Sequence, residues 1–242
     1  MTIWGIADIH ASPLDEAGVA EKPMERFGPA WEGHVERIEA AWRSSVQPDD
    51  TVIVAGDLDW SLHLEDAIPT LERLRRLPGI KLLVRGNHDY WWSSKATNKV
   101  RKVLPPSVHL IHNNVISVDG FAIGGAKGSP VPGGMEWDEQ DAKLLNRELE
   151  RLKLSADARA DAAPFVAALH FPPFYPASGP SPYVELLHSV GAVLCVYGHL
   201  HGESAHSGPS GTIDGIVYRC VAADYVGFRP VKLVEAGRIL EG

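Results

Sequence analysis

The chain has 242 residues, which is enough for one large α/β domain or two small ones and for a sizeable buried core. Hydrophobic residues make up 45% and charged residues 22% of it, so neither a disordered chain nor a collagen-like fibre is expected. The formal net charge of -8 leaves no bulk cationic surface. We therefore expect no bulk binding of duplex nucleic acid and none of an anionic membrane.

The two cysteines, Cys195 and Cys220, each lie in an apolar run typical of a strand. Two thiols are too few for a disulfide framework or an all-thiolate zinc site. Reduced thiols are the simpler interpretation, although one disulfide stays open. The N-terminal sequence has no basic region and no long apolar region of the signal-peptide kind, and no apolar run approaches membrane-spanning length. These features predict a cytoplasmic protein.

The first third of the chain alternates short apolar runs with amphipathic segments, the pattern of a sheet with crossover helices. Trp31, Val35, Ile38 and Trp42 recur at the spacing of one helical face. A βαβ unit with parallel strands follows. The predicted elements are, in chain order, a strand at 3–7, a loop at 11–30, a helix at 31–42, a strand at 51–55, a helix at 64–77 and a strand at 80–84.

The rest of the chain continues this alternation, and Asp119-Gly120 between two apolar runs signals a hairpin. The Gly- and Pro-rich stretches 126–134 and 171–182 predict loops. No internal repeat, low-complexity tract or linker occurs, so we expect a single α/β domain over residues 1–242. The remaining predicted elements are a basic helix near 91–103, strands at 115–118 and 121–125, a helix at 138–154, and strands at 164–169, 192–197, 216–222 and 231–235.

Oxygen and nitrogen donors recur where predicted strands end. Because ligands of open α/β sheets bind at the carboxyl ends of the strands, we expect these clusters to converge. A single one could be ordinary turn chemistry, since Asn, Asp and Gly dominate turns, but their repetition favours a common site. The clusters are Asp8-Ile9-His10, Gly56-Asp57-Leu58-Asp59, Gly86-Asn87-His88-Asp89, His170 and Gly198-His199-Leu200-His201.

The types of donor indicate a metal centre. Residues two apart in an extended segment project to one side, as in the pairs Asp8 with His10 and His199 with His201. Imidazole, carboxylate and amide donors without thiolate suit Mn, Fe, Co, Ni or Zn. The donors are too many for one ion, which a carboxylate shared between two ions would resolve, and the adjacent glycines would let the backbone approach closely. The other histidines are expected to be structural or solvated: His34, His63, His109, His112, His188 and His206.

These blocks, D-x-H, GD, GNHD, H and GHLH in this order, resemble the calcineurin-like metallophosphoesterase superfamily over Asp8 to His201. The resemblance implies a four-layer α/β/β/α sandwich with mixed sheets and a dinuclear metal site at the carboxyl ends of the strands. By motif position it assigns Asp8, His10 and His201 to one ion, Asn87, His170 and His199 to the second, and Asp57 as the bridge.

The implied reaction is hydrolysis of a phosphoester bond by in-line attack of a metal-bridging hydroxide. His88, beside a ligand but assigned to neither ion, is the candidate general acid for the leaving alkoxide. A neighbouring carboxylate would charge and orient it. Many family members place that acid three residues after the bridging Asp, whereas here Asp59 follows Asp57 by two. The choice between Asp59 and Asp89 as the supporting acid therefore stays open.

Arg85 and Lys127 are the candidate phosphate-binding residues, and Lys95 is a weaker one. Aromatic residues follow three of the motifs and either pack loops on the core or shape a cleft for an organic group. We expect a small organic or nucleotide phosphodiester or monoester as substrate. The alternatives are a nuclease for single-stranded nucleic acid and a non-catalytic binding protein on the same fold. The aromatic residues are Trp60, Tyr90, Trp91, Trp92, Phe171, Phe174 and Tyr175.

Overall fold

The computed structural model describes residues 1–15, 20–134, 136–160 and 162–241. It contains two mixed six-stranded sheets. The first has the order β12 (Arg238–Ile239), β11 (Val231–Glu235), β1 (Thr2–Ile6), β2 (Thr51–Ala55), β3 (Ile80–Val84) and β4 (Val108–Leu110). The second has the order β5 (Val115–Val118), β6 (Phe121–Ala126), β7 (Phe165–Leu169), β8 (Ala192–Tyr197), β10 (Ile216–Cys220) and β9 (Gly211–Ile213).

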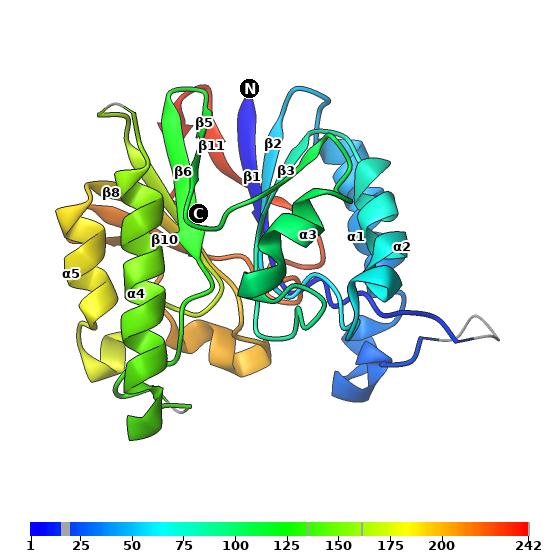
Figure 1. Cartoon of the computed structure of the whole chain (residues 1–242), viewed down its shortest axis with the longest axis horizontal. Helices are drawn as coiled ribbons and strands as arrows, with labels where there is room; N and C mark the ends of the chain where they lie inside the picture. Colours follow the sequence, from blue (N-terminus) through cyan, green and yellow to red (C-terminus); the bar gives the residue numbers. More distant parts are fainter. Residues whose placement is uncertain (16–19, 135, 161, 242) are drawn as a thin grey trace.

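Helices cover the outer faces of the two sheets, as Figure 1 shows. On one side lie α1 (His34–Ser45) and α2 (Leu64–Arg75), with the short α3 (Thr97–Arg101) near β3. On the other side lie α4 (Ala142–Asp157) and α5 (Pro182–Ser189). The four-layer α/β/β/α arrangement predicted from the sequence is therefore confirmed.

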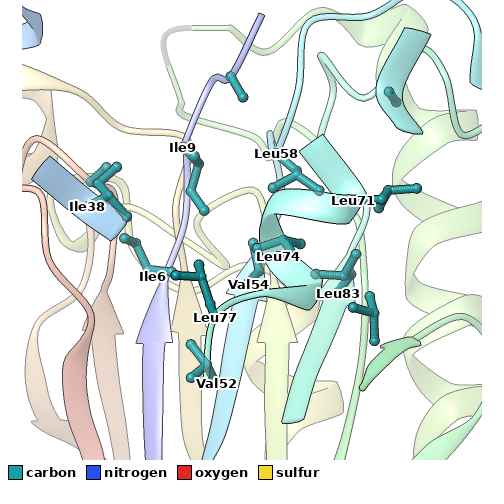
Figure 2. Packing of buried hydrophobic residues seen from close by; sticks show 14 of the residues in the cluster. Ile6, Ile9, Ile38, Val52, Val54, Leu58, Leu71, Leu74, Leu77 and Leu83 are labelled. Carbon is teal, nitrogen blue, oxygen red and sulfur yellow. The ribbon is translucent and has the colours of Figure 1, made fainter. Parts of the chain in front are cut away.

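The alternation of side chains along each strand builds the layers, because neighbouring residues face opposite sides of the sheet. In β2, Val52 and Val54 pack under the helices, whereas Ile53 packs against the second sheet. Figure 2 shows the cluster under the helices, in which Ile38 of α1 and Leu74 of α2 lie with these strand residues. Strands covered on both faces are mostly apolar, as the continuous runs in the sequence predicted, although β3 also contains the buried Lys81.

A second cluster joins the sheets to each other through Ile53 of β2, Leu82 of β3, Val166 of β7 and Leu194 of β8. A third lies between the second sheet and helices α4 and α5. The two sheets therefore share a core, and the ends of their central strands are held at a fixed distance. That rigidity is what a site made from loops of both sheets requires.

The βαβ unit and the hairpin are both confirmed. Strands β2 and β3 pair in parallel with α2 between them, and β5 and β6 pair antiparallel around Asp119-Gly120. Both cysteines are free and buried, on the neighbouring strands β8 and β10. No helix in the described part of the chain is long and apolar enough to cross a membrane.

Several boundaries differ from the predictions. The basic helix expected near 91–103 is only Thr97–Arg101 after a 3-10 turn, because Trp91 and Trp92 are buried in the core instead of lying on a helix. Helix α5 begins at the last residue of the predicted loop 171–182 and continues beyond it. The Ser181 side chain caps its start by accepting a hydrogen bond from the Tyr183 amide. The short strands β4, β9 and β12 were not predicted, and β10 ends at 220.

The predicted loop at 11–30 contains two 3-10 turns, Met24–Phe27 and Pro29–Trp31. Residues 16–19 of this loop lie outside the described residues.

Candidate metal centre

The strand register explains why donors far apart in sequence meet. Ile6 of β1 pairs with Val54 of β2, and Ala55 of β2 pairs with Val84 of β3, so the three strands end at one edge. The second sheet joins that edge through backbone hydrogen bonds from the Ala7 amide to the Val221 carbonyl (2.7 Å) and from the Ala223 amide to the Ala7 carbonyl (3.0 Å). The loops after β1, β2, β3, β7 and β8 therefore face one another.

One group of donors consists of Asp8, His10 and His201. Nε2 of His10 lies 3.9 Å and Nε2 of His201 lies 3.6 Å from Oδ1 of Asp8. Two ligands that share an ion at about 2.0–2.2 Å each lie at comparable separations. The spacing is therefore suitable for one bound cation.

A second group lies beside the first and consists of Asp8, Asp57 and His170, with Asn87 and His199 adjoining. Nε2 of His170 is 3.3 Å from Oδ2 of Asp57, and Oδ1 of Asn87 is 2.7 Å from that nitrogen and 3.0 Å from Nδ1 of His199. Oδ2 of Asp57 also lies 3.8 Å from Nε2 of His10. The structure thus brings all seven predicted ligands together. Asp8 belongs to both groups, and Asp57 lies near His10 of the first and His170 of the second.

The buried carboxylate oxygen Oδ1 of Asp8 tests whether a cation fits. Oδ1 of Asp8 and Nδ1 of His10 are buried and make no hydrogen bond. A buried carboxylate oxygen without a partner is strongly destabilising, and a bound cation would compensate it. Burial raises the pKa of Asp8, and the Asp57 carboxylate overcomes burial to raise the pKa of His170 to about 9. The donor set is nitrogen and oxygen without thiolate, so these residues fit divalent transition ions.

The backbone at the site is strained. Asp8, His10, Asp57 and His199 have φ angles of 57°, 50°, 53° and 72°, in the left-handed region that non-glycine residues rarely adopt. Such strain clusters at functional sites because the surrounding fold overdetermines it. Each of the four is a predicted ligand. The strain therefore supports a functional rather than a merely structural role for these turns.

The glycines of the motifs make room for ligand side chains. A Cβ on Gly86 would lie 1.9 Å from Oδ1 of Asp57, and a Cβ on Gly198 would lie 2.3 Å from Oδ2 of Asp8. From the sequence we expected these glycines to let the backbone approach the ions. The structure gives a different reason, because it is the ligand carboxylates that occupy the space a side chain would fill.

Three histidines are oriented by a second hydrogen bond. Nδ1 of His170 lies 3.0 Å from the Ala55 carbonyl, Nδ1 of His201 lies 2.9 Å from Oδ1 of Asp224, and Nε2 of His199 lies 3.0 Å from Oε2 of Glu136. In each ring the other nitrogen faces the donor cluster. Such partners fix the tautomer and raise the basicity of a ligating imidazole.

Sequence reasoning did not identify Asp224 or Glu136. Asp224 follows the apolar run 216–222 by two residues, so the rule that found Asp8 after its strand would also have found it. Glu136 lies in a loop with no such signal, and only the folded chain brings it to His199.

Replacing Asp224 with alanine is expected to weaken metal binding about 10- to 100-fold, the usual effect of removing an outer partner of a ligating histidine. The change frees His201 and leaves the Gly202 amide without its acceptor. Competition with a metal-sensitive dye would measure the affinity. Asp224→Asn keeps a hydrogen-bond acceptor and should lose less metal affinity. Equal metal affinity for wild type and Asp224→Ala would contradict the role of Asp224 as the partner of His201.

His88 lies beside the donors but neither Asp59 nor Asp89 is bonded to its ring. Its amide donates to Oδ1 of Asp57 (2.8 Å), and its Nδ1 lies 3.0 Å from the Tyr90 hydroxyl. Burial lowers the pKa of His88, although the Asp57 carboxylate opposes this shift. The expected carboxylate partner is therefore replaced by a phenol in the structure.

Asp59 and Asp89 have other partners instead. Asp59 accepts hydrogen bonds from the Ser61 amide (2.7 Å) and the Thr70 hydroxyl. Asp89 accepts from the amides of residues 57, 58, 59 and 86 and from the Trp91 indole. Both carboxylates are buried. Asp89 holds the turn that carries Asp57, whereas Asp59 ties the following segment to α2 through Thr70. Neither carboxylate is hydrogen-bonded to the His88 ring; Asp89 instead bonds the turn of the predicted ligand Asp57.

Asp89→Ala is expected to destabilise the protein by at least about 3 kcal/mol, because several buried N–H groups would lose a charged acceptor at once. Urea unfolding of the metal-free protein would measure it. Asp119→Asn, an exposed change in the hairpin turn, should stay within about 0.5 kcal/mol of wild type. An unchanged unfolding midpoint for Asp89→Ala would show that this carboxylate does not hold the turn.

The predicted cationic residues lie at different distances from the donors. Lys127 sits with its ammonium 4.8 Å from the Phe171 ring, which packs 4.0 Å from the His199 ring, and burial lowers its pKa to about 8. Arg85 is half-buried and donates to the Trp92 carbonyl (3.3 Å). Lys95 is exposed on a 3-10 turn. Lys127 is therefore the best placed of the three.

Most of the aromatic residues near the motifs are packing residues. Trp91, Trp92, Phe171 and Phe174 are buried. His34, expected to be structural, bonds the carbonyls of residues 9 and 31 through its two ring nitrogens. Trp60 is only partly buried and packs directly on His10 and His88.

A family model and two solved structures are similar to this chain. Residues 1–203 match the family model described as calcineurin-like phosphoesterase. No curated protein matches. A protein of unknown function, AQ665 from Aquifex aeolicus, is 15% identical, with a TM-score of 0.51 over 96% of this chain and 95% of that one. The phosphopantetheinyl hydrolase PptH from Mycobacterium tuberculosis is 20% identical, with a TM-score of 0.54 over 91% and 88%.

At these identities the two solved structures show a shared fold only. The family model is more informative, because its match spans most of the chain and includes every donor from Asp8 to His201. The chain therefore belongs to the calcineurin-like phosphoesterases, which are hydrolases of phosphoester bonds.

Proposed function

We propose that this protein is a dinuclear metal-dependent phosphoesterase for a small organic or nucleotide phosphodiester or monoester. The observation that carries the proposal is the position of Asp57, whose Oδ2 lies 3.3 Å from His170 and 3.8 Å from His10. One carboxylate beside two donor groups is what two neighbouring ions need. Asp8, His10 and His201 would hold the first ion, and Asn87, His170 and His199 the second.

Two bound divalent ions would lower the pKa of a water molecule and neutralise charge on the phosphoryl group. The chain itself would contribute orientation and a proton. His88 is the proposed general acid, with Tyr90 fixing its Nδ1 so that Nε2 is the nitrogen directed to a leaving group. Asp89 is proposed as a positioning residue for the Asp57 turn, and Asp59 for the segment that follows this turn.

Lys127 is the proposed cation for a phosphate oxygen. Its side chain lies against Phe171 at the edge of the donor cluster, and with a pKa of about 8 it is mostly charged at neutral pH. Arg85 is proposed to attract the phosphate without contacting it directly, since its guanidinium donates to the Trp92 carbonyl. A cation beside the ions stabilises the additional charge of an in-line transition state.

Metal analysis combined with hydrolysis of an aryl phosphate monoester and diester tests the proposal. Protein loaded with Mn, Ni, Co or Zn, or with Fe under anaerobic conditions, should hold two ions per chain and hydrolyse at least one of the two esters. The panel should include a phosphopantetheinyl ester, because a similar fold carries that activity. Tight metal binding without turnover would favour the non-catalytic binding protein, and turnover confined to single-stranded DNA would favour the nuclease.

A further inference from the structure

A groove of about 720 Å³ opens beside the donor cluster. Its walls are residues 11–14 and 20–25 of the N-terminal loop, the start of α1, and residues 60–73 up to and within α2. Of the seven donors, only His10 lines it. The groove therefore begins at the proposed metal centre and leads away from it.

Aromatic rings form the inner end of this groove. The Trp60 ring stacks on His10, with centroids 4.8 Å apart and planes 20° apart, and lies 4.1 Å from the His88 ring. The ammonium of Lys22 lies 5.2 Å from the Trp60 ring and 5.8 Å from the Tyr90 ring. Trp60 therefore forms the wall of the groove next to His10 and His88, and the Lys22 ammonium lies beside that wall.

The outer part of the groove is acidic. Two of its carboxylates are in ion pairs, Glu36 with Arg73 (2.9 Å) and Glu65 with Lys99 (3.0 Å). Together the charges repel a polyanion and tolerate a neutral or cationic chain. Among the described lining residues, the acidic side chains are Glu21, Glu25, Glu36, Glu65 and Asp66, and the cationic ones are Lys22 and Arg73.

We propose that this groove is the subsite for one esterified alcohol of a phosphodiester substrate, and that it selects an elongated group without negative charge. The inference rests on the proposed phosphoesterase function and makes its substrate class specific. A nucleic acid strand would bring further phosphates against the acidic wall, so the groove argues against the nuclease alternative.

Four 4-nitrophenyl phosphodiesters test the charge preference in the metal-loaded enzyme, differing only in the second ester: methyl, butyl, 3-(trimethylammonio)propyl and 3-carboxypropyl. At low ionic strength, kcat/KM should be at least about threefold higher for the cationic than for the anionic ester. Removing groove charge with Glu25→Gln and Asp66→Asn together should reduce that ratio. The matched change Asp119→Asn, in the remote hairpin turn, should leave it as in wild type.

The variant Trp60→Leu distinguishes two roles of Trp60: contact with the ester group of the substrate, and support of the His10 ring. If Trp60 contacts the ester group, KM should rise more for the butyl than for the methyl ester, and Trp60→Phe should restore most of the difference. An equal loss of kcat on both esters, accompanied by weaker metal binding, would show that Trp60 only supports its histidine neighbours.

Binding of the two products, 3-(trimethylammonio)propyl phosphate and 3-carboxypropyl phosphate, gives the same comparison without turnover by calorimetry. A tighter Kd for the cationic product, weakened by Glu25→Gln with Asp66→Asn, supports the subsite. Hydrolysis of all four esters with one common kcat/KM and equal product affinities would overturn the subsite and leave the proposed function intact. Hydrolysis of an aryl phosphate monoester but of none of the four diesters would overturn the subsite alone. Failure to hydrolyse the monoester and all four diesters with two ions bound would overturn the proposed function, and the subsite with it.

Discussion

Asp57→Ala is expected to abolish metal binding at one or both positions and to lower kcat/KM by at least about a thousandfold. Charge stabilisation by bound metal contributes several kcal/mol to such reactions, and each 1.4 kcal/mol lost is about tenfold in rate. Asp57 lies near a proposed ligand of each ion, His170 at 3.3 Å and His10 at 3.8 Å. Metal content by mass spectrometry and hydrolysis of an aryl phosphodiester would be measured on the same preparation.

The control for this experiment is to show that the variant still folds. Oδ1 of Asp57 also accepts the His88 amide, so the variant must be compared with wild type by circular dichroism in the metal-free state. Asp49→Asn, an exposed carboxylate after α1, should keep both metal and activity. A folded Asp57→Ala protein with two bound ions and wild-type turnover would contradict the bridging assignment.

His88→Gln is expected to keep both ions and to lower kcat about 10²- to 10⁴-fold on an alkyl ester, the usual contribution of a general acid. The loss should be much smaller on a 4-nitrophenyl ester, because nitrophenolate leaves without a proton. The difference between the two substrates is the informative quantity. It separates proton donation from a general disturbance of the site, which would affect both esters alike.

Tyr90→Phe is the companion variant, since it removes the hydroxyl at Nδ1 of His88 while keeping the ring near Lys22. We expect a smaller loss of kcat than in His88→Gln, again confined to the alkyl ester. Full activity of His88→Gln on an ester with a poor leaving group would show that His88 is not the general acid. It would leave the metal assignment unaffected.

The strands and the donors were accessible from the sequence because both leave local signals. Apolar runs such as 51–55 and 80–84 mark strands covered on both faces. The donors follow strand ends by one to four residues, and the register of parallel strands brings such positions together, as for Asp8 and Asp57. The resemblance to a known family then supplied the assignment of ligands to two ions.

The remaining parts of the site depend on contacts without a local pattern. Glu136 reaches His199 across 63 residues, and Asp89 reaches the Asp57 turn across about thirty. Helix α5 follows a proline-rich segment, and because these prolines also predict a loop, the sequence does not reveal where the helix begins. The groove at Trp60 arises from the packing of a loop against α2, which periodicity does not describe. The single domain and the cytoplasmic location stay predictions.

Diffraction from metal-loaded crystals at an anomalous edge tests the central claim most directly. The account predicts two peaks about 3.5–4 Å apart, one among Asp8, His10 and His201, the other among Asn87, His170 and His199, with Asp57 touching both. A single peak, or two peaks elsewhere with Asp57 contacting neither, would contradict it.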